Sequence, residues 1–163
     1  MSARDYAPRP GDYGVVKTNG VVAKFIRIGT LSRWNHVFIY IGDGLIVEAR
    51  PTGVTISKDD LYPIMAYNQH EIDLDDEKRK AIVDFAKAQV GKPYGFIDIA
   101  VIFLRMLGLR IPFPNFWAKL AKRQGFICSE LVAEAYLKAG FKLINKHSSI
   151  VTPGDLAERL IYQ

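Results

Sequence analysis

The chain has 163 residues, which is enough for one domain with a buried core, and we expect a single domain over residues 1–163. Hydrophobic residues make up 49% and charged residues 24%, a composition that excludes a largely disordered chain. The net charge of +5 is mild and scattered, so we expect no nucleic-acid partner. One cysteine excludes an internal disulfide and a multi-cysteine metal site.

Two segments bear on membranes and export. The first fourteen residues, MSARDYAPRPGDYG, lack the apolar core of a secretory signal. We therefore expect a protein that is cytoplasmic or exported by a route not encoded in the chain. The most hydrophobic stretch, residues 96–113, is interrupted by Asp98, Arg105 and Arg110, so we expect no membrane span there.

The first half of the chain reads mainly as strands. Residues 9–18 predict a turn that leads into a strand, whereas residues 20–30 fit either a short helix or a strand. In residues 35–54, two β-branched and aromatic runs flank Gly-Asp-Gly, which predicts a hairpin. Residues 67–74 suggest a further strand.

The second half reads as helices. Residues 75–91 predict an amphipathic helix with acidic residues at its start and an apolar face made of Ile82, Phe85, Ala86 and Val90. A second helix starts at Cys128 and ends at Gly140, and a short last helix has Thr152 as its N-cap and Pro153 at its first position. Strands followed by helices predict an α+β fold, with an antiparallel sheet packed against helices.

Cys128 stands at the N-terminal edge of its helix, where unpaired backbone N–H groups and the helix dipole favour an anion. A thiolate is stabilised at such a position and is the nucleophilic form of cysteine. The same N–H groups could hold a developing oxyanion. The alternative is a buried cysteine in a packed helix.

Three histidines could serve as the base. His70 lies among acidic residues and fits a solvated strand end, and His147 fits an exposed polar loop. His36 opens the strand HVFIYI and shares one face with Phe38 and Tyr40. It is either a base or a core histidine whose ring is satisfied by the backbone.

The hairpin register decides what lies beside His36. If residues 42–44 form a three-residue loop, Phe38 faces Glu48, and Glu48 lies diagonally from His36 on the same face. A two-residue loop would place Glu48 on the opposite face. On the first register Glu48 can orient the imidazole and stabilise its charge; otherwise it is an exposed strand carboxylate.

SRWNHVFIYIGDGLIVEARPTGV, followed far downstream by FICSELVAEAYLKAG, resembles the circularly permuted branch of the NlpC/P60 papain-like superfamily. That branch includes the YiiX/YebB-like amidases and, more distantly, the lecithin:retinol acyltransferase-like proteins. In ordinary NlpC/P60 enzymes the cysteine helix precedes the histidine strand, whereas here the order is reversed. The resemblance runs from PGDYG near the start to TPGDLAERL near the end.

The resemblance implies a papain-like thiol hydrolase with Cys128 as nucleophile, His36 as base and Glu48 as the orienting residue, and with no metal or organic cofactor. GKPYGF resembles the segment before the cysteine in NlpC/P60 domains, which makes Tyr94 a candidate for the substrate-binding wall; an ordinary Pro-Tyr turn is the alternative. GFI precedes the cysteine where cell-wall enzymes commonly carry an aspartate, which weakens the transfer of their substrate preference.

Three functions stay open on the sequence. The superfamily favours hydrolysis of an amide, with peptidoglycan peptides as the substrate class. A lipid-directed acyl hydrolase or acyltransferase is the second, for which the apolar residues 96–120 would form an acyl-chain rim or a peripheral membrane contact rather than core. A non-catalytic binding module of the same fold is the third.

Overall fold

The structure is a computed structural model of the 163-residue chain. It describes residues 7–20, 23–24, 27–28, 32–62, 65–68, 74–95 and 126–161. The apolar stretch 96–120 and His70, both considered above, lie outside the described residues.

The described strands form one antiparallel sheet of five, in the order β4-β3-β2-β1-β5. Their bounds are β1 Tyr13–Val16, β2 His36–Gly42, β3 Leu45–Arg50, β4 Gly53–Lys58 and β5 Met65–Tyr67. Of residues 67–74, where a strand was expected, Tyr67 ends β5, Asn68 and Leu74 are not in a strand, and residues 69–73 lie outside the described residues. A three-residue strand is too short to show an alternating pattern of its own.

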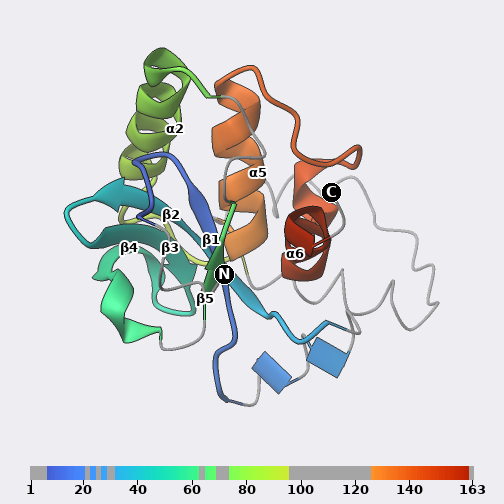
Figure 1. The fold of residues 1–163 in the computed structure, drawn as a ribbon. Coiled ribbons are helices and arrows are strands. Elements are labelled where there is room, and N and C mark those ends of the chain that lie inside the picture. The colour runs from blue at the N-terminus through green and yellow to red at the C-terminus, as the bar shows by residue number, and fades with distance from the viewer. Residues whose placement is uncertain are drawn as a thin grey trace, which may run out of the picture.

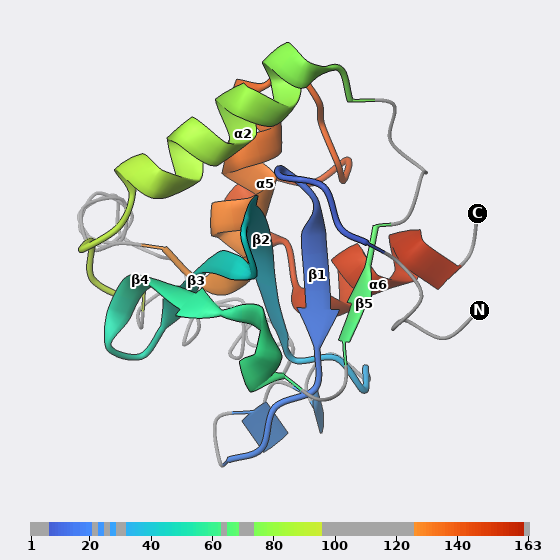
Figure 2. The same ribbon diagram turned by 60° about the vertical axis from the view of Figure 1, so that its left-hand side comes forward.

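The helices and short 3₁₀ turns whose full bounds are described are α2 Asp76–Ala88, α5 Cys128–Lys138, α6 Pro153–Ile161, η1 Asp59–Leu61 and η2 Ser148–Ile150. Of the segment 20–30, residues 23–24 and 27–28 are helical, and residues 21–22, 25–26 and 29–30 lie outside the described residues. Helices α2 and α5 lie side by side over one face of the sheet, and α6 lies near β1 (Figures 1 and 2). The predicted α+β class is confirmed.

Helix α2 begins where the acidic run predicts. The side chain of Asp75 accepts a hydrogen bond from the backbone N–H of Lys78 at 2.8 Å, which caps the helix. Ile82 and Ala86 are fully buried, as expected. Val90 is not part of this face: it follows the end of the helix and is 42% exposed.

The last helix has a reciprocal cap. The hydroxyl of Thr152 accepts from the N–H of Asp155 at 3.1 Å, and the carboxylate of Asp155 accepts from the N–H of Thr152 at 2.9 Å. Pro153 occupies the first helical position, as predicted.

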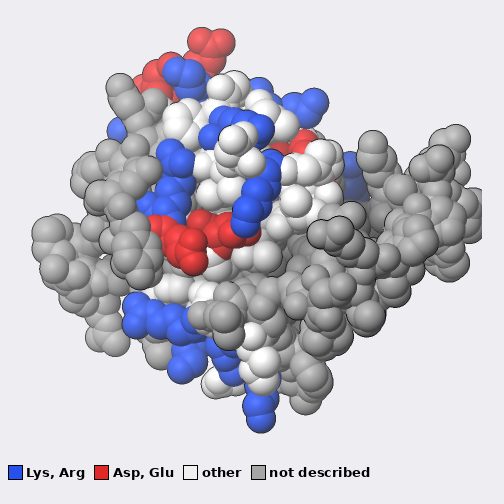
Figure 3. Space-filling view, turned by 90° about the vertical axis from the view of Figure 1, so that its right-hand side faces the viewer, with Lys and Arg blue, Asp and Glu red and all other residues white. Residues whose placement is uncertain are grey.

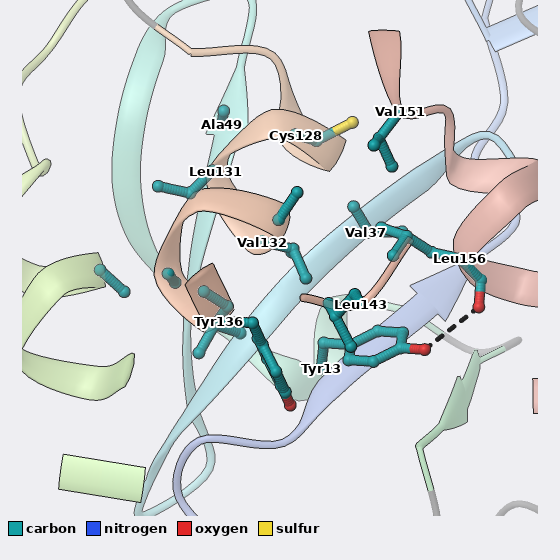
Figure 4. Packing of buried hydrophobic residues seen from close by; sticks show 14 of the residues in the cluster. Tyr13, Val37, Ala49, Cys128, Leu131, Val132, Tyr136, Leu143, Val151 and Leu156 are labelled. Carbon is teal, nitrogen blue, oxygen red and sulfur yellow. Dashed lines mark hydrogen bonds between the residues drawn. The ribbon is translucent and has the colours of Figure 1, made fainter. Parts of the chain in front are cut away.

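The main core lies between the sheet and the helices (Figure 4). Val37 and Ile39 of β2 contribute to it from the sheet, and Leu131 and Val132 contribute from α5. Tyr13 joins the sheet to α6, because its hydroxyl donates to the carbonyl of Leu156 at 3.2 Å.

The opposite face of the sheet carries a smaller buried cluster, made of Val16, Phe38, Ile46, Tyr62 and Tyr67. Gly14 of β1 is part of the reason that Phe38 fits there. A Cβ at Gly14 would lie 2.4 Å from Cζ of Phe38, so only glycine leaves room for the ring.

The described surface near α6 carries both signs of charge. Figure 3 shows acidic side chains between groups of basic ones on this face, and Lys146 pairs with Asp155 at 2.7 Å. Within the described ranges, no helix has the length and apolar character to span a bilayer.

Candidate active site

The β2–β3 hairpin sets the geometry of the candidate site. Ile39 pairs with Val47 and Tyr40 with Ile46, which is the register expected for Glu48 and His36 to share one face. The turn itself differs from the three-residue loop predicted above. It has two residues, Asp43 and Gly44, and the register shifts at a bulge between Tyr40 and Gly42.

Because of the bulge, a two-residue turn gives the same strand register as the predicted three-residue loop. Asp43 and Gly44 both have positive φ, +53° and +68°, as a tight hairpin turn with an Asp-Gly pair requires. The extra residue at the bulge then shifts one strand by one position, so Glu48 remains on the face of His36. The third residue between the paired strand positions is therefore in the bulge and not in the turn.

His36 and Glu48 form a buried pair. Nε2 of His36 lies 2.6 Å from Oε2 of Glu48, and the two side chains are 11% and 0% exposed. A carboxylate at this distance fixes the ring orientation and places a proton on Nε2. Nδ1 is thereby left for a second partner.

The thiol of Cys128 lies near this pair. Cys128 is the first residue of α5, after the N-cap Ile127, and is 3% exposed. The thiol is close enough to the ring of His36, the first residue of β2, to raise the pKa of that ring. Figure 4 shows the sulfur at the end of the helix, on the side of Val151.

The start of α5 is anchored without a cap. The hydroxyl of Ser129 donates to the carbonyl of Val151 at 2.6 Å and is fully buried. Ile127 has no side chain that could cap the helix, and no side-chain capping bond is present at this end. The first-turn N–H groups therefore point toward the region of the thiol, where an anion is favoured.

The charges of the three side chains support one another. Burial by itself lowers the pKa of His36, but the charge of the Cys128 thiolate, the hydrogen bond to its sulfur and the contact with Glu48 raise it from 6.5 to about 9. Burial by itself raises the pKa of Glu48, but His36, with further hydrogen bonds from Ser57 and Tyr62, lowers it from 4.5 to about 2. At neutral pH a buried imidazolium therefore lies beside the Glu48 carboxylate.

Three residues around Glu48 were not identified from the sequence: Arg50, Tyr62 and Ser57. The hydroxyl of Tyr62 donates to Oε2 of Glu48 at 2.5 Å, and Nε of Arg50 lies 3.8 Å from Oε1. Arg50 faces His36 in the predicted hairpin register, and this pairing is a sequence signal for its place near the site. Tyr62 follows the irregular turn η1, and no sequence pattern connects it to Glu48.

Tyr94 lies beside the segment that leads into Cys128. It forms a parallel bridge with Phe126, and the N–H of Gly95 donates to the carbonyl of Phe126 at 3.2 Å. Tyr94 is buried, and this burial, together with the nearby charge of Cys128, raises its pKa well above 10. The substrate-binding role remains an expectation.

The remaining polar candidates are engaged elsewhere. His147 is exposed and caps η2, where its Nδ1 lies 2.9 Å from the hydroxyl of Ser149. Asn35 precedes His36 in the chain, so its side chain is another candidate for orienting the ring. That side chain instead accepts hydrogen bonds from the N–H of Thr18 at 3.0 Å and from Arg27 at 3.1 Å. Over the described ranges, no cluster of three or more histidine, cysteine or acidic residues is arranged to hold a metal ion.

No family model matches the chain. The chain is similar to the probable lipoprotein peptidase YaeF of Escherichia coli (strain K12), with 28% identity over 173 aligned positions that cover 91% of this chain. The chain spans 62% of the length of that protein, less than two thirds. The similarity is distant, but it extends over nearly all of this chain.

Proposed function

We propose that this protein is a cysteine hydrolase of circularly permuted papain-like fold, which cleaves amide bonds through an acyl-enzyme on Cys128. The observation that supports the proposal most is the buried hydrogen bond between the ring of His36 and Glu48 at 2.6 Å, near a thiol that raises the pKa of the same ring. The chain order, histidine, then glutamate, then cysteine, supports the permutation. The distant relative is itself described as a probable peptidase.

The proposed reaction has two halves. The thiolate of Cys128 forms a bond with the carbonyl carbon, and N–H groups at the start of α5 stabilise the resulting oxyanion. The C–N bond then breaks, and the imidazolium of His36 gives its Nδ1 proton to the leaving amine. Water attacks the thioester while His36 takes a proton from it, and the carboxylic acid leaves as the thiolate is restored.

Glu48 assists both halves without touching the substrate. As an anion bonded to Nε2, it keeps the ring oriented and stabilises the positive charge that His36 carries before it protonates the amine and after it takes a proton from water. Tyr94 is proposed to line the substrate cleft beside Cys128, because it lies next to the segment that precedes the thiol.

For the substrate we propose a peptide amide, with cell-wall peptides as the first class to test. The purified protein and a Cys128→Ala variant are incubated in parallel with peptidoglycan peptides, phospholipids and acyl esters, and products are identified by mass. Peptide fragments formed by the wild type alone support the proposal. Cleavage restricted to lipid esters would replace the amide by a lipid substrate, and no turnover of any class would favour a binding module.

A further inference from the structure

Tyr62 is held in place by its position directly after η1 and by the contacts of its ring with Phe38 and His36. It follows η1, whose first residue, Asp59, donates its N–H to the carbonyl of Gly44 at 3.0 Å and so fixes η1 against the hairpin turn. The ring of Tyr62 stacks on Phe38, with centroids 6.0 Å apart and planes at 9°, and it lies 5.8 Å from the ring of His36. The side chain is largely buried, so its hydroxyl has little freedom.

The hydroxyl of Tyr62 and the ring of His36 share one acceptor atom. Oε2 of Glu48 lies 2.5 Å from Oη of Tyr62 and 2.6 Å from Nε2 of His36. Charge-assisted hydrogen bonds of this length are among the stronger ones in proteins. A carboxylate with donors on two sides of one oxygen cannot rotate that oxygen away from the ring.

Tyr62 remains a donor at every pH at which the protein is expected to be folded. Burial, followed by the hydrogen bond to Glu48 and the charge of that carboxylate, raises the pKa of Tyr62 well above its ordinary value of 10. It therefore stabilises the Glu48 anion in a region that water does not reach.

Arg50 cannot replace this contact. Its Nε lies 3.8 Å from the other oxygen, Oε1, which is longer than a hydrogen bond, and its side chain is 45% exposed. Arg50 contributes charge near Glu48, but it does not fix the position of Oε2.

We infer that Tyr62 is a positioning residue, which acts through Glu48 to keep the imidazole of His36 aligned with Cys128. This inference rests on the proposed cysteine chemistry. It adds a fourth member to the network, one whose effect depends wholly on the presence of the Glu48 carboxylate.

The test is a double-mutant cycle in which the reactivity of the Cys128 thiol is measured. Tyr62→Phe keeps the ring stack and removes one hydroxyl, and Glu48→Gln removes the acceptor's charge. The rate of Cys128 alkylation by iodoacetamide is measured on the folded protein by intact mass across pH. Tyr40→Phe is the matched control, because Tyr40 packs against the same cluster but its hydroxyl accepts from the N–H of Gly44 at 3.1 Å.

We expect Tyr62→Phe to lower the alkylation rate at neutral pH roughly 3- to 10-fold, within the range that coupled neighbours show. The acid-side midpoint of the profile should move to higher pH, because a less firmly held carboxylate stabilises the imidazolium less. In the Glu48→Gln background, where the acceptor is a neutral amide oxygen, the same change should have a much smaller effect, and Tyr40→Phe should leave rate and midpoint unchanged.

Three results would overturn the inference. A Tyr62→Phe rate equal to wild type would show that the hydroxyl does not position the network. An equal loss in both backgrounds would show that Tyr62 does not act through Glu48. A wild-type thiol that is inert in the folded protein would refute the cysteine chemistry itself, and the inference with it.

A second measurement, NMR of the wild-type protein, does not depend on whether Tyr62→Phe folds. In wild-type protein the hydroxyl proton of Tyr62, buried and bonded to a carboxylate, should exchange slowly enough to give a downfield NMR signal. The signal should show a cross-peak to the ring of His36. A wild-type spectrum that shows the His36 ring proton on Nε2 but no such hydroxyl signal would contradict the inference.

Discussion

Replacing Glu48 by glutamine removes the negative charge from the buried pair while nearly preserving the size of the side chain. The pKa of Glu48 is lowered from 4.5 to about 2 in the folded protein. At about 1.36 kcal/mol for each pH unit, this lowering corresponds to at most about 3 kcal/mol of folding free energy. Because the side chain of Glu48 is 0% exposed, solvent screens this contribution to folding very little.

The pH range of this contribution follows from its direction. Between pH 4.5 and 2 the unfolded chain binds a proton at Glu48 that the folded protein does not, so stability rises with pH over this range. The contribution is complete above pH 4.5 and is lost as the pH falls through about 2. A neutral glutamine cannot make it at any pH.

The assay is urea unfolding of wild type and Glu48→Gln at several pH values from 6 down to 3. We expect the variant to be less stable by up to about 3 kcal/mol at pH 6, and the difference to shrink steadily as the pH falls below 4.5. Other carboxylates titrate in both proteins and cancel in the difference. A difference that stays constant from pH 6 to pH 3 would refute the ionised pair and, with it, the charge assigned to His36.

Two further predictions concern the base and the packing beneath it. His36→Ala should reduce turnover by on the order of 10²–10⁴-fold, measured as initial rate on a cleaved substrate, whereas His70→Ala and His147→Ala should change it little; an essential His147 would contradict the assignment of the base. Gly14→Ala should lower the free energy of unfolding by about 1–3 kcal/mol in urea titration, because the new Cβ would lie 2.4 Å from the ring of Phe38, and an unchanged midpoint would show that the ring moves freely.

The hairpin and the helix starts were predictable because their signals are local. Gly-Asp-Gly lies between two alternating runs, and both Asp75 and Thr152 precede a helix with a side chain that can cap it. The proximity of His36 and Glu48 followed from counting residues across the hairpin. The bulge at Ile41 was not predictable, since a three-residue loop and a two-residue turn with one extra residue give the same register.

Tyr62 and Val90 show what local patterns miss. Tyr62 reaches Glu48 only because η1 folds back on the hairpin turn and Phe38 supports its ring, and both contacts are tertiary. Val90 continues the apolar spacing of α2, but the helix ends at Ala88, so its side chain is turned to solvent. Residue type and spacing therefore suggest the proposed chemistry, whereas the contacts that hold the candidate residues in place are set by packing.

The most direct test of the account is the pH profile of Cys128 alkylation in the folded wild-type protein, followed by intact mass. Limited access to a thiol that is 3% exposed would slow the reaction but would not move its midpoint. The account predicts a midpoint clearly below about 8.5, the value for a free cysteine, and a shift of that midpoint toward 8.5 in His36→Ala. A thiol that reacts only after denaturation, or with the midpoint of free cysteine, would contradict the account.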